Sequence, residues 1–137
     1  MRVDPPAEDS AVEEEAPERS IGGAAFWALM DRWGVPDEMA LRLIAGPAPK
    51  RKGARPRFRL RGAQVETYEL LRGIDRHLED LFGASRAWLS APVRDKPFAR
   101  RAPLAFMVEG GREAIVATLR HLERQAFRAS LERSARS

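Results

Sequence analysis

Seven cationic side chains lie close together in residues 50–61, and no acidic residue interrupts them. Guanidinium and ammonium groups at this density attract phosphate, so the stretch is a candidate surface for a nucleic-acid backbone. The alternative is a solvated loop whose charges only keep the protein soluble. The candidate phosphate-binding residues are Lys50, Arg51, Lys52, Arg55, Arg57, Arg59 and Arg61.

Residues suited to catalysis are few. His77 and His121 each lie one step from an apolar position of an expected helix, without a Ser/His/Asp order, a metal-ligand spacing or a phosphate-binding glycine loop nearby. The chain has no cysteine, which excludes disulfides and thiolate chemistry. Gly110 and Gly111 could offer backbone N–H groups to an anion, although a tight turn explains the pair without a ligand. We therefore expect no catalytic residue, no cofactor and no metal.

The elements that would position these residues follow from helical spacing of apolar side chains. Residues 24–33 form a first expected helix, ended by Gly34, and a second begins with Pro36 in its first turn and ends at Gly46. Prolines and glycines break any regular helix in residues 47–63, where residues 57–60 alternate and favour an extended segment.

The second half predicts one long helix, two short ones and a last long one. A third helix runs from Gln64 to a C-terminal glycine, Gly83, with an apolar stripe at Leu71, Ile74, Leu78, Leu81 and Phe82. Ser85 is expected to cap a short turn that Pro92 stops, and Pro103 begins a short helix stopped by the glycine pair. Trp88, Leu104 and Phe106 are expected to supply most of the buried area of these two short helices. Trp27 and Trp33 are expected to be core residues as well. The last helix has an apolar stripe at Ile115, Leu119, Leu122, Ala126 and Phe127.

Composition limits the architecture. The 137 residues, 44% hydrophobic and 32% charged, suit one compact domain with a tail. Seven acids against two bases in residues 1–20 predict a disordered acidic tail, which leaves the rest more basic than the overall charge of +4. No stretch has the character of a membrane span or a signal peptide, so we expect a cytoplasmic protein. A small core without disulfides also favours oligomerisation, and we expect a homodimer.

The order of several short motifs resembles the C-terminal toxin-binding domain of the Xre/MbcA/ParS family of antitoxins. The resemblance covers roughly residues 64–124, and residues 26–46 resemble the helix-turn start of the family's N-terminal DNA-binding-like half. The chain differs from the usual family pattern at Val93, where asparagine is common, and at Arg100, where glycine is common. The matching motifs are Leu81-Phe82-Gly83, Trp88-Leu89, Pro92, Arg101-Ala102-Pro103-Leu104 and Gly110-Gly111.

The resemblance implies an all-α fold, a small helical bundle with three parts. Residues 1–20 are the acidic tail, residues 21–63 a degenerate helix-turn-helix-like region with a basic loop, and residues 64–137 the toxin-binding domain. It implies an antitoxin of a type II toxin–antitoxin system that covers the cofactor entrance of a RES-domain, NAD-consuming toxin and regulates its own operon. A DNA-binding regulator without a toxin is the alternative, and an enzyme of unrecognised type is kept as the third. The prolines of residues 47–63 leave no long recognition helix, so we expect contact with operator phosphates rather than bases.

The expected toxin-binding residues lie in two groups. The first is implied by the family motifs, and the second continues the last helix beyond the needs of the domain's own core, with an apolar edge and several cations suited to a groove on another protein. A helix that frays into solvent after Gln125 is the alternative for the second group. The residues are Trp88, Arg100, Arg101, Gly110, Gly111, Arg124, Phe127, Arg128 and Leu131.

Overall fold

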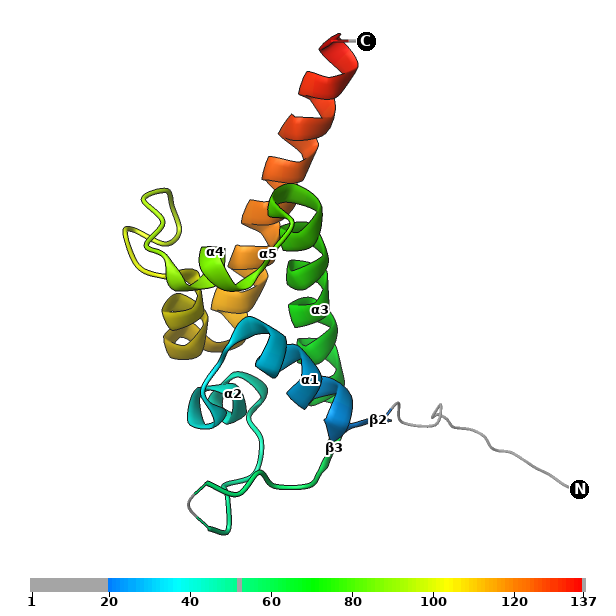
Figure 1. Ribbon diagram of the computed structural model, residues 1–137, viewed down its shortest axis with the longest axis vertical. Coiled ribbons are helices and arrows are strands. Elements are labelled where there is room, and N and C mark those ends of the chain that lie inside the picture. Colours follow the sequence, from blue (N-terminus) through cyan, green and yellow to red (C-terminus); the bar gives the residue numbers. More distant parts are fainter. Residues whose placement is uncertain (1–19, 52, 137) are drawn as a thin grey trace, which may run out of the picture.

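The computed structural model describes residues 20–51 and 53–136 as a helical bundle with a small two-stranded sheet at one end (Figure 1). The predicted helical fold is confirmed. The predictions of an acidic tail at residues 1–20 and of a phosphate-binding Lys52 fall outside the described residues, apart from Ser20. The elements are β2 (Ser20–Gly22), α1 (Gly23–Trp33), α2 (Asp37–Ile44), β3 (Arg59–Arg61), α3 (Ala63–Phe82), α4 (Arg86–Ser90) and α5 (Pro103–Arg136).

The first two helices end where a residue adopts the left-handed backbone conformation. Gly34 suits this position because its φ is 73°, a conformation that glycine adopts without strain. Its N–H donates hydrogen bonds to carbonyl groups of the last turn of α1. Ala45, with φ 54°, ends α2 in the same way without the freedom of a glycine. Pro36 precedes α2 as its N-cap and is not its first helical residue, a difference of one position from the prediction.

An antiparallel pair of short strands joins the start of the described chain to the end of the basic segment. Ser20 pairs with Arg61 and Gly22 with Arg59, a contact between distant segments that the sequence did not indicate. The extended segment expected at residues 57–60 is a strand at Arg59–Arg61. The Gly23 N–H donates to the Phe58 carbonyl, and a Cβ on Gly23 would lie 2.5 Å from that oxygen, so only glycine fits there.

Helices α3 and α5 pack along each other, with α1, α2 and α4 against them, and all five helices contribute side chains to the core (Figure 1). The expected stripe of α3 is confirmed at Leu71, Ile74 and Leu78, which are fully buried. Phe82 departs from it, since half of this side chain is exposed. One continuous hydrophobic cluster runs from α1 to α5, so the N-terminal and C-terminal halves share a core.

The short helix α4 differs from the prediction in two ways. Ser85 makes no cap hydrogen bond to the helix; its hydroxyl donates instead to Asp75 of α3, with 2.7 Å between the oxygens. Trp88 is only half-buried, while its neighbour Leu89 is fully buried. The fully buried aromatic ring of this region is Phe98, in the loop after α4, and no sequence pattern singles it out. Phe106 is likewise only partly buried, and Leu104 is buried as expected.

The glycine pair divides α5 into two helical segments, as the sequence predicted. Gly111 has φ 72° and ψ −151°, a conformation that strains any residue with a side chain, and the helix axis breaks there. The predicted apolar stripe of the second segment is fully buried at Ile115 and Leu122 but does not continue to Phe127, whose side chain is exposed. None of its later described residues is buried, and its last turns extend beyond the end of α3 (Figure 1).

Candidate functional site

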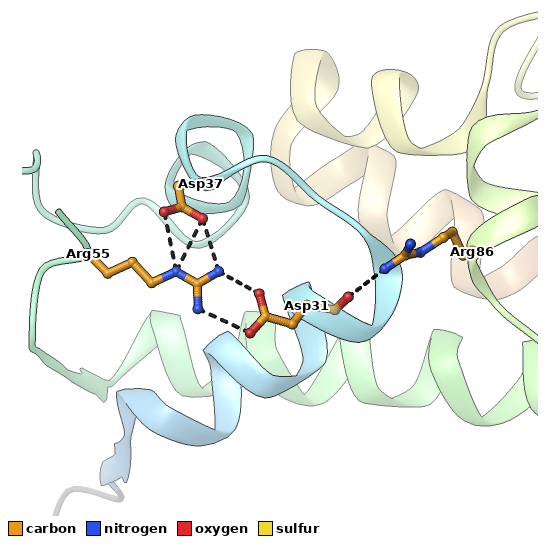
Figure 2. Close-up of polar contacts among 4 residues, drawn as sticks. All are labelled: Asp31, Asp37, Arg55 and Arg86. Carbon is orange, nitrogen blue, oxygen red and sulfur yellow. Dashed lines mark hydrogen bonds and ion pairs between the residues drawn. The ribbon is translucent and has the colours of Figure 1, made fainter. Parts of the chain in front are cut away.

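One arginine of the basic segment is held inside a clasp of two carboxylates (Figure 2). The Nε of Arg55 donates to both carboxylate oxygens of Asp37 at 3.2 Å, and its Nη atoms donate to Asp31. The guanidinium also lies 4.5 Å from the centroid of the Trp27 ring. Hydrogen bonding from Arg55 lowers the pKa of Asp31, and the two aspartates raise the pKa of Arg55.

This clasp joins the basic segment to the two helices before it. Arg86 of α4 donates to the backbone carbonyl of Asp31 at 2.8 Å and lies over Gly34, where a Cβ would approach its Nε to 2.6 Å (Figure 2). The sequence-based hypothesis grouped Arg55 with the phosphate-binding cations. The structure instead pairs it with carboxylates of α1 and α2, so its charge is already balanced within the protein.

The other described cations of the segment have no carboxylate partner among residues 20–51 and 53–136. Arg59 bonds only a neutral group, the hydroxyl of Ser20, at 3.1 Å. An open groove of about 670 Å³ lies beside them, between the start of α1 and the Arg55–Arg59 segment, with Trp27 and Phe58 in its wall. The exposed cations that have no acidic partner in the described part of the chain are Lys50, Arg51, Arg57, Arg59 and Arg61.

Two residues of the first predicted toxin-binding group, Arg100 and Arg101, lie in the loop between α4 and α5. Val93 and Arg101 form an isolated antiparallel bridge, and Arg101 pairs with Glu109 and lies over the Phe106 ring. Arg100 is exposed and has φ 72°. Glycine is the residue that tolerates this conformation most readily, so the backbone at Arg100 is strained.

Trp88 connects this loop to α5. Its ring stacks on Phe82 at 6.3 Å and on His121 at 6.3 Å, and meets the edge of Phe98 at 5.6 Å. His121 is buried, and its Nε2 has no hydrogen-bond partner among the described residues. Burial lowers the pKa of His121, and the charges of Arg124 and Arg128 lower it further. His121 is thus a buried side chain of α5 that packs against Trp88 and Phe98.

The second predicted group lies on the projecting end of α5. Phe127 is 65% exposed and Leu131 is 53% exposed; since they are four residues apart, they lie on one face of the helix. Arg124, Phe127 and Arg128 share a shallow hollow of about 580 Å³. Arg124 and Arg128 follow His121, which stacks on Trp88, by three and seven residues along α5, whereas Gly110 and Gly111 lie at the other end of this helical segment.

A buried polar cluster that the sequence did not reveal holds the two halves in register. Asp75 of α3 is 7% exposed and accepts hydrogen bonds from the Trp33 indole at 2.8 Å, from the Ser85 hydroxyl and from Arg32. Burial alone would raise the pKa of Asp75, but these three donors outweigh it and leave the pKa lowered. The contacts span α1, α3 and the start of α4, so no local pattern could indicate them.

Comparisons with protein-family models, curated proteins and solved structures find no significant match for this chain. Within residues 20–51 and 53–136, no cluster of three or more histidine, aspartate or glutamate side chains could hold a metal ion. None of the helices in this part of the chain is long and apolar enough to span a lipid bilayer.

Proposed function

We propose that this protein is an antitoxin that binds a partner toxin through the end of α5 and prevents the toxin from acting. The observation that carries the proposal is the helical extension of residues 123–136, in which no described residue is buried. A helix of this length is marginal in water unless other groups pack on it. Its exposed Phe127 and Leu131 are the kind of apolar side chains that anchor a helix in a groove of another protein.

The charge of this extension indicates the character of the groove. Arg124 and Arg128 are four residues apart and flank the exposed phenyl ring of Phe127. Guanidinium groups in that arrangement suit carboxylates or a phosphate-binding pocket. A RES-domain toxin, the partner that the motif resemblance implies, consumes NAD and must bind its pyrophosphate, so occlusion of the cofactor entrance is the mechanism we propose. The antitoxin then needs no catalytic residue, cofactor or metal of its own.

The same proposal includes a cytoplasmic homodimer and regulation of its own operon. The exposed cations without a carboxylate partner favour contact with DNA phosphates, which also supports the second candidate function, a regulator without a toxin. No described residue of 45–58 is helical, so base reading by a recognition helix is not part of either proposal.

The antitoxin proposal is tested by co-expression with a RES-domain protein, chosen first from any encoded beside the gene of this chain. The parent chain is expected to restore growth and cellular NAD, and the double variant Phe127→Ala, Leu131→Ala to lose most of the rescue. The matched control is Ser130→Ala, on the same exposed helix, which should rescue fully. A chain truncated after Gln125 should remain folded by circular dichroism and also fail to rescue.

Full rescue by the truncated chain would move the toxin-binding surface to Trp88 and the Arg100–Arg101 loop. Failure of the parent chain to rescue, together with the absence of any neighbouring RES-domain gene, would refute the antitoxin function and leave the regulator.

A further inference from the structure

The exposed arginines of the basic segment are arranged on one face of the chain. Arg57, Arg59 and Arg61 alternate with Phe58 and Leu60, and Leu60 is fully buried while the three arginines are exposed. Side chains two residues apart on an extended chain point to the same side, about 7 Å from each other. These three arginines, called the arginine stripe below, therefore present a row of positive charges without a carboxylate partner in the described part of the chain.

The acidic residues that could balance this row precede β2 in the same chain. Residues 1–19 carry seven acidic and two basic side chains, a formal charge of −5, and residues 20–137 carry thirteen acidic and twenty-two basic ones, a formal charge of +9. The acids include a run at Glu13, Glu14 and Glu15, followed by Glu18. The two parts of the chain are thus opposite in charge and covalently joined.

The fold fixes the junction between them directly beside the arginine stripe. Ser20 pairs with Arg61 across the two strands, and its hydroxyl accepts hydrogen bonds from Arg59. Glu18 lies only two residues before Ser20. We propose that the acidic segment of residues 4–18 docks on the arginine stripe of its own molecule and competes there with phosphate.

The reach and the concentration of the segment suffice for this contact. Fifteen residues span up to about 50 Å when extended, whereas the radius of gyration of a domain of this size is about 13 Å. A segment attached through a short linker acts at an effective concentration on the order of millimolar. Weak individual ion pairs therefore add up to substantial occupancy at low ionic strength, although each is worth little alone.

The groove beside the stripe accepts the rest of the segment. It is bordered by Arg57 and Arg59 and walled by Trp27, Pro56 and Phe58. The acids of the segment are interspersed with Ala11, Val12, Ala16 and Pro17, small apolar residues that fit such a wall. The proposal goes beyond the antitoxin function and does not depend on it, because neither the stripe nor the segment includes a toxin-binding residue.

The docking is tested in the full chain by paramagnetic broadening. The chain has no cysteine, so Ser10→Cys gives a single site for a nitroxide label. We expect the backbone amide signals of residues 57–61 to broaden at low salt and to recover at about 0.5 M salt, where the Debye length is only a few ångströms. A label at Ser130→Cys is the control and should leave these signals sharp, because residue 130 belongs to the last turns of α5, which project from the bundle away from β3 (Figure 1).

Absence of broadening at residues 57–61 at low salt would overturn the proposal. A mixture of nitroxide-labelled protein with isotope-enriched protein that carries no nitroxide tests whether the segment docks on a second copy of the chain. Broadening of the enriched protein to the same extent would mean that the segment docks on a second copy, which also overturns the intramolecular contact.

Competition with phosphate is measured with a short mixed-sequence DNA duplex at about 0.05 M salt. Four glutamates of the segment are changed to glutamine, and the matched control removes four exposed glutamates elsewhere, so both proteins gain the same charge. The segment variant should bind the duplex about fivefold more tightly than the control. Equal affinities, including no binding by either, would overturn the competition. The two sets are Glu13→Gln, Glu14→Gln, Glu15→Gln, Glu18→Gln and Glu79→Gln, Glu113→Gln, Glu123→Gln, Glu132→Gln.

Discussion

The polar cluster at Asp75 and the projecting end of α5 use their side chains in opposite ways. Asp75 is 7% exposed, and its donors come from the end of α1 and from Ser85, the residue before α4. Residues 123–136 contain large apolar and cationic side chains, yet none of those described is buried. The difference indicates that the first region fixes how the helices pack, whereas the second contributes little to the fold and is available to a partner.

The largest expected effect comes from Asp75→Ala. This change leaves the buried Trp33 indole N–H and the Ser85 hydroxyl without an acceptor, and we expect a loss of about 3–5 kcal/mol in the free energy of unfolding. Urea denaturation measures it. Asp80→Ala, an exposed aspartate of the same helix, is the control and should change stability by less than about 0.5 kcal/mol. Equal stability of the two variants would contradict the packing role of the cluster.

Trp88→Ala tests the boundary between the two regions. Trp88 is half-buried between Phe82, Phe98 and His121. Its removal should therefore cost about 2–3 kcal/mol, less than the roughly 3–5 kcal/mol lost when a fully buried aromatic side chain is truncated to alanine. Thermal and urea denaturation give the value. A loss within a few tenths of a kcal/mol would show that the ring belongs to the exposed surface and not to the packed core.

The buried His121 should make stability dependent on pH. Its pKa in the folded protein is lowered from 6.5 by burial, whereas the unfolded chain keeps the ordinary value, so the unfolded state binds the proton first. The contribution of His121 is therefore complete above pH 6.5 and is lost as the pH falls through the folded value. Denaturation at a series of pH values measures the loss, and His121→Phe, which keeps an aromatic ring without a titrating group, should flatten the dependence in this range. An unchanged profile in that variant would refute the assignment.

The smallest expected effect is that of the exposed face of α5. Phe127→Ala with Leu131→Ala should change the free energy of unfolding by no more than about 0.5 kcal/mol, because neither side chain is buried in the monomer. Urea denaturation at low protein concentration measures it. A second copy would cover this face if the double variant lost more stability than this and if the stability of the parent rose with protein concentration.

Helix positions were predictable from the sequence because their determinants are local. The apolar spacing of α3 and the glycines at positions 34, 83 and 111 act within a few residues of their own positions, and all three glycines have positive φ. Ser85 shows the limit of such reasoning. A serine before a short helix is a good cap, but a buried carboxylate ten residues earlier offers its hydroxyl a better acceptor.

The candidate sites were predictable only in part for the same reason. The density of cations in residues 50–61 is a property of composition, and so is the mixture of apolar and basic residues after Leu122. Which cations are free is a property of packing. Arg55 meets carboxylates 18 and 24 residues earlier in the chain, and the two strands bring Ser20 to Arg61.

The sequence by itself determined the helices, their ends and the opposite charges of the two parts of the chain, because these depend on local backbone preference and on composition. Only the tertiary structure decided that Phe98 is buried and Trp88 half-exposed, that Asp75 collects three donors, and that the acidic segment begins beside the arginine stripe. Those features depend on which distant segments meet, and burial and hydrogen bonding between distant segments leave no periodic trace in the chain.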